Sequence, residues 1–219
     1  PYFGENDLIA VTDCIKSGWV SSAGKYVEEF EKQIAEFLGS KYCVVTNSGT
    51  SALHVSLVCS GVSRGTEVLC PSATFVATAN AISYCGAIPN FIDCEKSFPN
   101  ISLEKLNDYL ESKFFIDNND LVNKKTKRKV SAIIPMHAFG HPVNMDRLKE
   151  IFRDINIAII EDAAEAFGSI FNDQFVGNES RCAIFSFNGN KIITSGAGGC
   201  LVTNNKDLFE RAKHISTTA

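Results

Sequence analysis

Apolar residues along the chain form two patterns that alternate. Short apolar runs, typical of buried strands, occur at 41–46, 67–71, 87–95, 130–138, 157–164, 182–188 and 199–204. Between most of them, apolar residues recur at helical spacing, in 47–61, 74–86, 102–114, 144–154 and 206–215. Strands that alternate with helices form a parallel sheet with helices on both faces. The pattern therefore predicts a three-layer α/β/α fold with a mainly parallel sheet.

One polar segment interrupts this order. Residues 117–129, DNNDLVNKKTKRK, are polar and become increasingly basic toward their end. We interpret the segment as an exposed insertion and its basic end, 124–129, as a solvated surface. A phosphate-binding patch is the alternative interpretation of that basic end.

Composition narrows the class of protein. The 219 residues have 45% hydrophobic content, enough for one sizeable core, and a net charge of −4, which attracts neither nucleic acid nor an anionic membrane. No apolar run approaches the ~18 residues that span a bilayer, and the first residues lack the features of a signal peptide. Eight scattered cysteines without a C-x-x-C pair suit free thiols in the cytoplasm. No cluster has metal-ligand spacing, so we expect no metal, nucleic-acid or membrane partner.

Polar residues follow several predicted strands directly. They lie at 47–51, at Asp162 and at 186–191. Ligands of parallel α/β sheets bind beyond the carboxyl ends of the strands. We therefore expect one site at this edge of the sheet.

The stretch TNSGTSAL runs from a predicted strand into a predicted helix. Gly49 permits a tight turn, and the N–H groups that open the helix, with the hydroxyls of Thr50 and Ser51, suit an anion such as phosphate. The spacing matches neither a P-loop nor a dinucleotide fingerprint. An ordinary capped helix start is the alternative explanation.

A carboxylate and a lysine supply the remaining chemistry. Asp162 follows four apolar residues and Glu161, where it either caps the next turn or pairs with a protonated ring nitrogen of a cofactor. Lys191 lies in SFNGNKIITSGAGG, where glycines allow close backbone approach; it is either a loop lysine or an amine that reacts with a carbonyl. Together with an anion site, these groups are what pyridoxal phosphate requires of a protein.

A resemblance carries the interpretation further. The chain contains, in order, SGWVSSAGKYVEEFEK, TNSGTSALHVSL, PSATFVATANAI, IPNFIDCE, PMHAFGHPVNMD, EDAAEAFGS and SFNGNKIITSGAGG. This series resembles the DegT/StrS-type, fold-type I aminotransferases, which depend on pyridoxal phosphate and act on nucleotide-linked keto sugars. The resemblance runs along essentially the whole chain.

The resemblance implies a role for each candidate residue. Lys191 would be the lysine that bonds to the cofactor and moves the proton during amine transfer, and Asp162 would contact the pyridine nitrogen. Phe75 would stack on the ring, although core packing explains it equally well. Glu165 would lie near the ring's phenolic oxygen. The phosphate would be held by Gly49, Thr50, Ser51 and Ser186.

The resemblance also implies a substrate. Glu165 and the SFNGNKIIT stretch resemble the subgroup that makes 4-amino-4,6-dideoxy sugars for bacterial surface glycans. The expected acceptor is a UDP-linked 4-keto-6-deoxy-N-acetylhexosamine, with glutamate as amino donor and a homodimer as the working unit. Trp19 and His137 are candidate substrate contacts, and packing is the alternative role for both.

The resemblance implies a domain division as well. Residues 1–30 would lead into a large pyridoxal phosphate-binding domain at 31–219. Family members are much longer and carry a smaller C-terminal domain that this sequence lacks. A non-catalytic or regulatory fragment that keeps the cofactor-binding fold is therefore the alternative to a transaminase.

Overall fold

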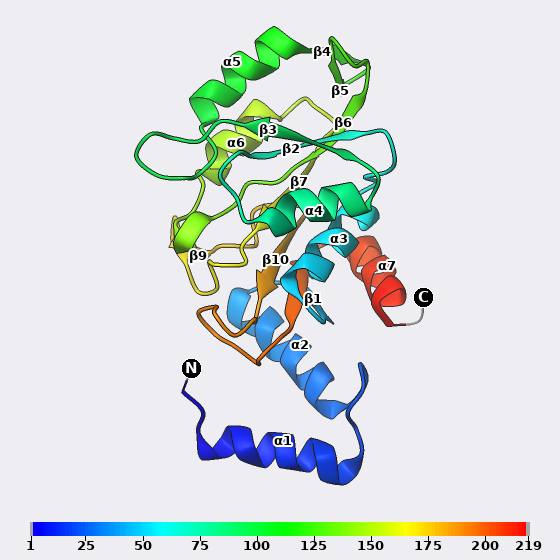
Figure 1. The fold of residues 1–219 in the computed structure, drawn as a ribbon, viewed down its shortest axis with the longest axis vertical. Helices are drawn as coiled ribbons and strands as arrows, with labels where there is room; N and C mark the ends of the chain where they lie inside the picture. Colours follow the sequence, from blue (N-terminus) through cyan, green and yellow to red (C-terminus); the bar gives the residue numbers. More distant parts are fainter. Residues whose placement is uncertain (1, 218–219) are drawn as a thin grey trace.

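The computed structural model describes residues 2–217, and Figure 1 shows their arrangement. In these residues the helices are α1 Glu5–Ser17, α2 Lys25–Leu38, α3 Gly49–Cys59, α4 Val76–Tyr84, α5 Leu103–Lys113, α6 Met145–Ile151 and α7 Lys206–Thr217, with a 3-10 turn η1 at Ala138–Gly140. The strands are β1 Tyr42–Thr46, β2 Glu67–Pro71, β3 Ile88–Ile92, β4 Phe114–Asp117, β5 Asp120–Asn123, β6 Lys129–Ile133, β7 Ala158–Asp162, β8 Ile170–Phe171, β9 Gln174–Phe175, β10 Cys182–Ser186 and β11 Gly199–Thr203.

One large sheet forms the centre of the molecule. Its strands lie in the order β1-β11-β10-β7-β6-β2-β3. In addition, β5 pairs with β4 and with the first two residues of β6, Lys129 and Val130. The pairs from β10 through β7, β6 and β2 to β3 are parallel, whereas β11 runs antiparallel to both of its neighbours. The prediction of a mainly parallel sheet is confirmed.

Helices cover both faces of this sheet. On one face the buried side chains of the strands pack against Leu53 of α3, Ile82 of α4 and Leu208 of α7. On the other face, α5 and α6 cover one half of the sheet and α2 covers the other half. Successive strand residues point to opposite faces, so each strand contributes side chains to the buried clusters on both faces of the sheet. The predicted three-layer α/β/α architecture is confirmed.

The predicted exposed loop at 117–129 is wrong in its first part. Residues 114–123 form the β4–β5 hairpin, and Leu121 is 2% exposed within the core under α5. Asn118 and Asn119 turn the chain with φ of 49° and 66°, a left-handed conformation that asparagine tolerates. The Asn-Asn pair between two short apolar runs was the available signal. Residues 124–128 are exposed, as predicted.

The N-terminal part of the chain forms two helices that the apolar pattern did not single out. α2 buries Ile34, Ala35 and Leu38, and it runs through residues 30 and 31, where we expected the domain to begin. α1 has no buried residue and lies apart from the sheet, beyond α2 (Figure 1). Residues 218 and 219 of the expected domain lie outside the described residues. Within 2–217, no helix is both long and apolar enough to cross a membrane.

Candidate active site

A cavity of about 230 Å³ opens at the carboxyl ends of the parallel strands. The loops after β1, β2, β6, β7 and β10 all contribute to its wall. This is the edge of the sheet where the sequence predicts a site. Among the residues singled out from the sequence, the lining contains Gly49, Thr50, Phe75, Asp162, Glu165, Ser186 and Lys191.

The Lys191 amine lies within this cavity. Its side chain is only 12% exposed, and its Nζ is 3.1 Å from Oε1 of Glu165 and 5.8 Å from the ring centre of Phe75. Phe75 itself is 67% exposed, so its ring is accessible to a partner in the cavity. A lysine amine, a carboxylate and an exposed aromatic ring therefore share one wall.

Glu165 bridges the lysine and a neighbouring loop. Its Oε1 accepts from the Lys191 amine, and its Oε2 accepts a hydrogen bond of 3.0 Å from the backbone N–H of Phe139. The backbone donor holds the carboxylate in place, because both of its oxygens are engaged. The Lys191 amine is therefore paired with a carboxylate whose position is fixed by the neighbouring loop.

Asp162 is buried at the end of β7. Its Oδ2 accepts a hydrogen bond of 2.8 Å from the hydroxyl of Thr78, and its Oδ1 accepts one of 3.3 Å from the N–H of Ala164. Burial raises the pKa of Asp162, and these hydrogen bonds and the nearby Lys191 only partly oppose that effect. A cationic donor placed in the cavity would relieve this cost, which is what a protonated ring nitrogen supplies.

The start of α3 forms the anion-binding wall. Ser48 caps the helix, since its Oγ accepts from the Ser51 N–H at 3.1 Å and lies 3.0 Å from the Ser51 hydroxyl. The Ser51 hydroxyl therefore belongs to the cap and is not part of the lining, whereas Ser48 is. The N–H groups of Gly49 and Thr50 open the helix and have no acceptor within it. N–H groups at the first turn of a helix are suited to a phosphate.

Two glycines allow this wall to form. A Cβ on Gly49 would lie 2.9 Å from Cβ of Ser186, and a Cβ on Gly199 would lie 2.4 Å from the backbone nitrogen of Gly49. Such distances are far inside van der Waals contact. The start of α3 therefore packs directly on β10 and β11 only because these positions lack side chains.

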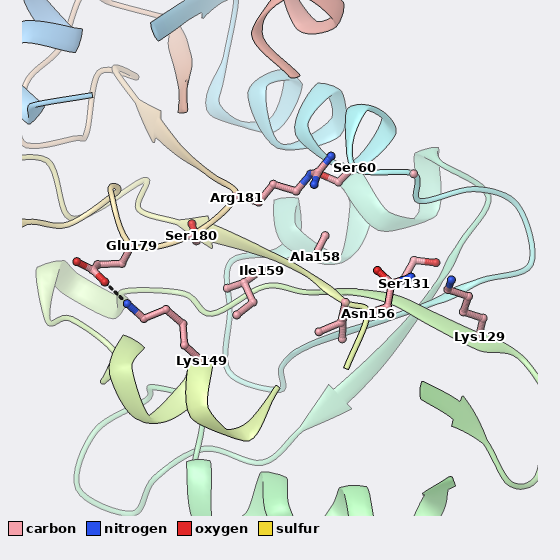
Figure 2. A pocket seen from close by; sticks show the side chains of 12 residues that line it. Ser60, Lys129, Ser131, Lys149, Asn156, Ala158, Ile159, Glu179, Ser180 and Arg181 are labelled. Carbon is pink, nitrogen blue, oxygen red and sulfur yellow. Dashed lines mark hydrogen bonds and ion pairs between the residues drawn. The ribbon is translucent and has the colours of Figure 1, made fainter. Parts of the chain in front are cut away.

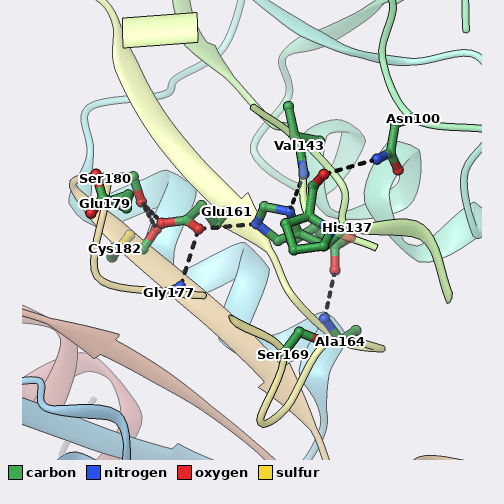
Figure 3. Close-up of polar contacts among 12 residues, drawn as sticks. Asn100, His137, Val143, Glu161, Ala164, Ser169, Gly177, Glu179, Ser180 and Cys182 are labelled. Atoms are coloured by element: carbon green, nitrogen blue, oxygen red, sulfur yellow. Dashed lines mark hydrogen bonds and ion pairs between the residues drawn. The ribbon is translucent and has the colours of Figure 1, made fainter. Parts of the chain in front are cut away.

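The two predicted substrate contacts have other surroundings than the cavity lining. His137 is completely buried, and its Nε2 is 3.0 Å from Oε2 of Glu161 (Figure 3). Trp19 lies in the connection between α1 and α2 and is 62% exposed. Neither residue belongs to the lining. Their substrate roles remain predictions.

Several lining residues were given no individual role from the sequence, although Ser48, Asn188 and Asn190 lie in the polar stretches 47–51 and 186–191 where the site was expected. They are Ser48, Leu53, Ala77, Met136, Ala164, Ile184, Asn188 and Asn190. The two asparagines flank Gly189 in the stretch that contains Lys191, and this position was the available signal for them. Thr78, which bonds to Asp162, gave no comparable signal because it lies inside an apolar helix. Within the described part of the chain, no group of His, Cys, Asp or Glu residues could hold a metal ion.

A larger hollow of about 560 Å³ lies at the opposite edge of the sheet (Figure 2). It is bounded by the amino ends of β6, β7 and β10. Its two lysines are ion-paired, Lys129 with Asp120 at 2.7 Å and Lys149 with Glu179 and Asp146. Acidic partners neutralise the charge of these two lysines, whereas Lys191, Asp162 and the start of α3 all lie at the other edge of the sheet. The smaller cavity is therefore the candidate active site.

Comparisons with known proteins agree with this geometry. Residues 1–219 match the DegT/DnrJ/EryC1/StrS aminotransferase family. The GDP-perosamine synthase of Caulobacter vibrioides is 39% identical over 213 residues, which cover 97% of this chain and 53% of that protein.

Solved structures give the same result. A DegT DnrJ EryC1 StrS aminotransferase from Brucella abortus superposes with a TM-score of 0.86 at 30% identity, covering 96% of this chain and 54% of that one. NtdA from Bacillus subtilis, solved with bound cofactor PMP, has a TM-score of 0.83 at 26% identity and covers 97% and 44%. The chain thus spans about half the length of the relatives it matches.

Proposed function

Because the chain belongs to the DegT/DnrJ/EryC1/StrS aminotransferase family, we propose that it is the cofactor-binding part of a sugar aminotransferase that uses pyridoxal phosphate. The family's dependence on that cofactor agrees with the PMP-bound relative. The main support for the proposal is that Lys191, Asp162 and the start of α3 line the same cavity.

The residues present fit this cofactor in three ways. The open N–H groups of Gly49 and Thr50 suit its phosphate, and the exposed aromatic side chain of Phe75 suits its ring. Among the described residues, the buried Asp162 carboxylate accepts from a hydroxyl and a backbone N–H and from no cationic group, which suits a protonated ring nitrogen. When bound, pyridoxal phosphate supplies an aldehyde that captures amines and a ring that withdraws electrons.

In the proposed reaction each residue has a defined role. Lys191 Nζ would hold the cofactor covalently, and it would also serve as the acid and base that moves a proton during the exchange of the amino group. Asp162 would stabilise the protonated ring nitrogen, and Glu165 would orient the Lys191 amine. The donor leaves as a 2-oxo acid, and the keto carbon of the acceptor becomes an amine.

We propose glutamate as the donor and a nucleotide-linked 4-keto-6-deoxy sugar as the acceptor. The sequence led us to expect UDP as the nucleotide. The relative named GDP-perosamine synthase favours GDP instead. The homodimer and the cytoplasmic location remain predictions.

Absorbance spectroscopy tests the proposal. With added pyridoxal phosphate, the wild-type chain should become yellow, and glutamate should bleach the band. Either the GDP-linked or the UDP-linked keto sugar should then restore it, which identifies the nucleotide. Lys191→Ala should stay colourless, whereas Lys32→Ala, which removes an exposed lysine of α2, should behave like wild type.

A wild-type chain that stays colourless with the cofactor would refute the proposal. A yellow chain whose band is unchanged by glutamate would favour a fragment that binds the cofactor without transferring amines.

A further inference from the structure

A buried histidine–carboxylate pair lies directly behind the candidate site, and the proposed reaction does not use it. Glu161 and Asp162 are consecutive residues of β7, so their side chains point to opposite faces of the sheet. Asp162 faces the cavity, whereas Glu161 lies on the far side with 0% exposure. His137 is equally buried beside it (Figure 3).

The Glu161 carboxylate is fully engaged by donors. Its Oε2 accepts from His137 Nε2 at 3.0 Å and from the Gly177 N–H at 3.2 Å, and its Oε1 accepts from the Ser180 hydroxyl at 2.7 Å. Three donors compensate the burial of one carboxylate. Glu161 is therefore a fixed anchor in the layer beneath β7.

The imidazole of His137 connects this anchor to a loop. Its Nδ1 accepts a hydrogen bond of 3.0 Å from the Val143 N–H, so the ring proton is on Nε2 and is donated to Glu161. The backbone N–H of His137 also bonds to the carbonyl of Asp162 at 3.0 Å. The ring thus ties both ends of the 137–143 loop to β7.

This loop is linked to Lys191 through Phe139 and Glu165. Phe139 lies in the loop with φ of 49°, a left-handed conformation that is rare for an aromatic residue. Its N–H donates to Glu165, which in turn holds the Lys191 amine. Strained backbone of this kind persists where its surroundings enforce it, and the two bonds of the His137 ring close the loop that contains it.

We propose that His137 and Glu161 are positioning residues. They hold the 137–143 loop in place, and the loop in turn holds Glu165 against the Lys191 amine. The inference rests on the proposed role of Lys191 as the reactive amine. It assigns to His137 an indirect role from the far face of the sheet.

Chemical labelling of the cofactor-free protein tests this chain of contacts. Only the neutral lysine amine reacts with acetic anhydride, so the labelling rate of Lys191, followed by peptide mass spectrometry at one fixed pH, reports how firmly Glu165 holds the ammonium. His137→Asn keeps an acceptor for Val143 but loses the donor to Glu161, whereas His137→Gln has the reverse effect. Each should raise Lys191 labelling by about two- to fivefold, the range expected for weakening a partly exposed ion pair.

Two further variants separate positioning from general loosening. Ser180→Ala removes a hydrogen bond from the same Glu161 carboxylate but leaves both bonds of the His137 ring, so it should raise labelling less than either His137 variant. In a Glu165→Gln background, His137→Asn should add nothing, because its effect passes through the carboxylate that is now missing. Circular dichroism confirms folding for each variant, and His137→Gln replaces His137→Asn if the latter does not fold.

Equal labelling of wild type and both His137 variants would overturn the inference. So would an increase by His137→Asn that persists undiminished in the Glu165→Gln background. Because labelling needs neither cofactor nor sugar, it can succeed or fail independently of the transamination assay.

Discussion

At the scale of single residues, two neighbouring carboxylates receive different environments from one strand. Glu161 is compensated by three donors from the protein, whereas Asp162 has a hydroxyl and one distant N–H. The incomplete compensation of Asp162 raises its pKa. Burial of an incompletely compensated charge lowers the stability of the folded protein, and such destabilising groups are typical of functional sites.

This cost makes a prediction about pH. Because the pKa of Asp162 is raised in the folded state, its contribution to stability is present below its ordinary pKa of 3.8 and is lost as the pH rises through the raised value. In cofactor-free protein, Asp162→Asn should therefore raise Tm at neutral pH by about 2–4 °C, and the gain should shrink in acid.

Thermal unfolding across a pH series measures this effect. Asp154→Asn, at an exposed position after α6, serves as the control and should leave Tm nearly unchanged at every pH. A lower Tm of Asp162→Asn at neutral pH would contradict the explanation.

At the scale of elements, the β4–β5 hairpin belongs to the core of the α5–α6 face. Leu121 of β5 packs in the same buried cluster as Leu106 of α5 and Leu148 of α6. Its neighbour Val122 points away and is only partly buried. The hairpin extends the sheet along Lys129 and Val130, the first residues of β6, where the structure describes no pairing with β7.

Truncation of one hairpin residue tests this assignment. Leu121→Ala should lower the free energy of unfolding by about 2–4 kcal/mol, because it leaves a cavity in a closed cluster. Val122→Ala should cost clearly less. Urea denaturation measures both, and equal small losses for the two variants would show that the hairpin is peripheral.

At the scale of the whole molecule, α1 stands apart from the rest of the fold. None of its residues is buried, and Leu8 and Val11 are 68% and 59% exposed. α2, in contrast, inserts Leu38, which is 1% exposed, into the core beneath β1 and β11. We therefore expect α2 to contribute to the free energy of unfolding and α1 to contribute little.

A matched pair of variants checks this boundary. Replacing Leu8 and Val11 together by Gln should change the free energy of unfolding by no more than about 0.5 kcal/mol, as for other surface substitutions. Leu38→Ala should cost about 2–4 kcal/mol. A large loss for the α1 variant in urea denaturation would mean that its apolar side chains are covered in solution.

The sequence by itself determined the order of strands and helices, because burial on a sheet or a helix leaves a local period in the apolar residues. It also predicted that Lys191, Asp162 and the start of α3 lie at one edge of the sheet, because turns after strands expose polar residues at predictable places. α2 and the β4–β5 hairpin escaped this reasoning, since their local signals were overlooked or hidden among charged residues.

Only the tertiary structure decided which of these groups meet. Strand order depends on pairings between distant segments, such as β11 between β1 and β10, and no local period encodes them. That order brings Glu165 to Lys191 and Thr78 to Asp162, and it turns His137 away from the cavity toward Glu161. The orientation of a buried polar side chain and its hydrogen-bond partner depend on the whole packed fold, because the groups that satisfy its hydrogen bonds come from distant segments of the chain.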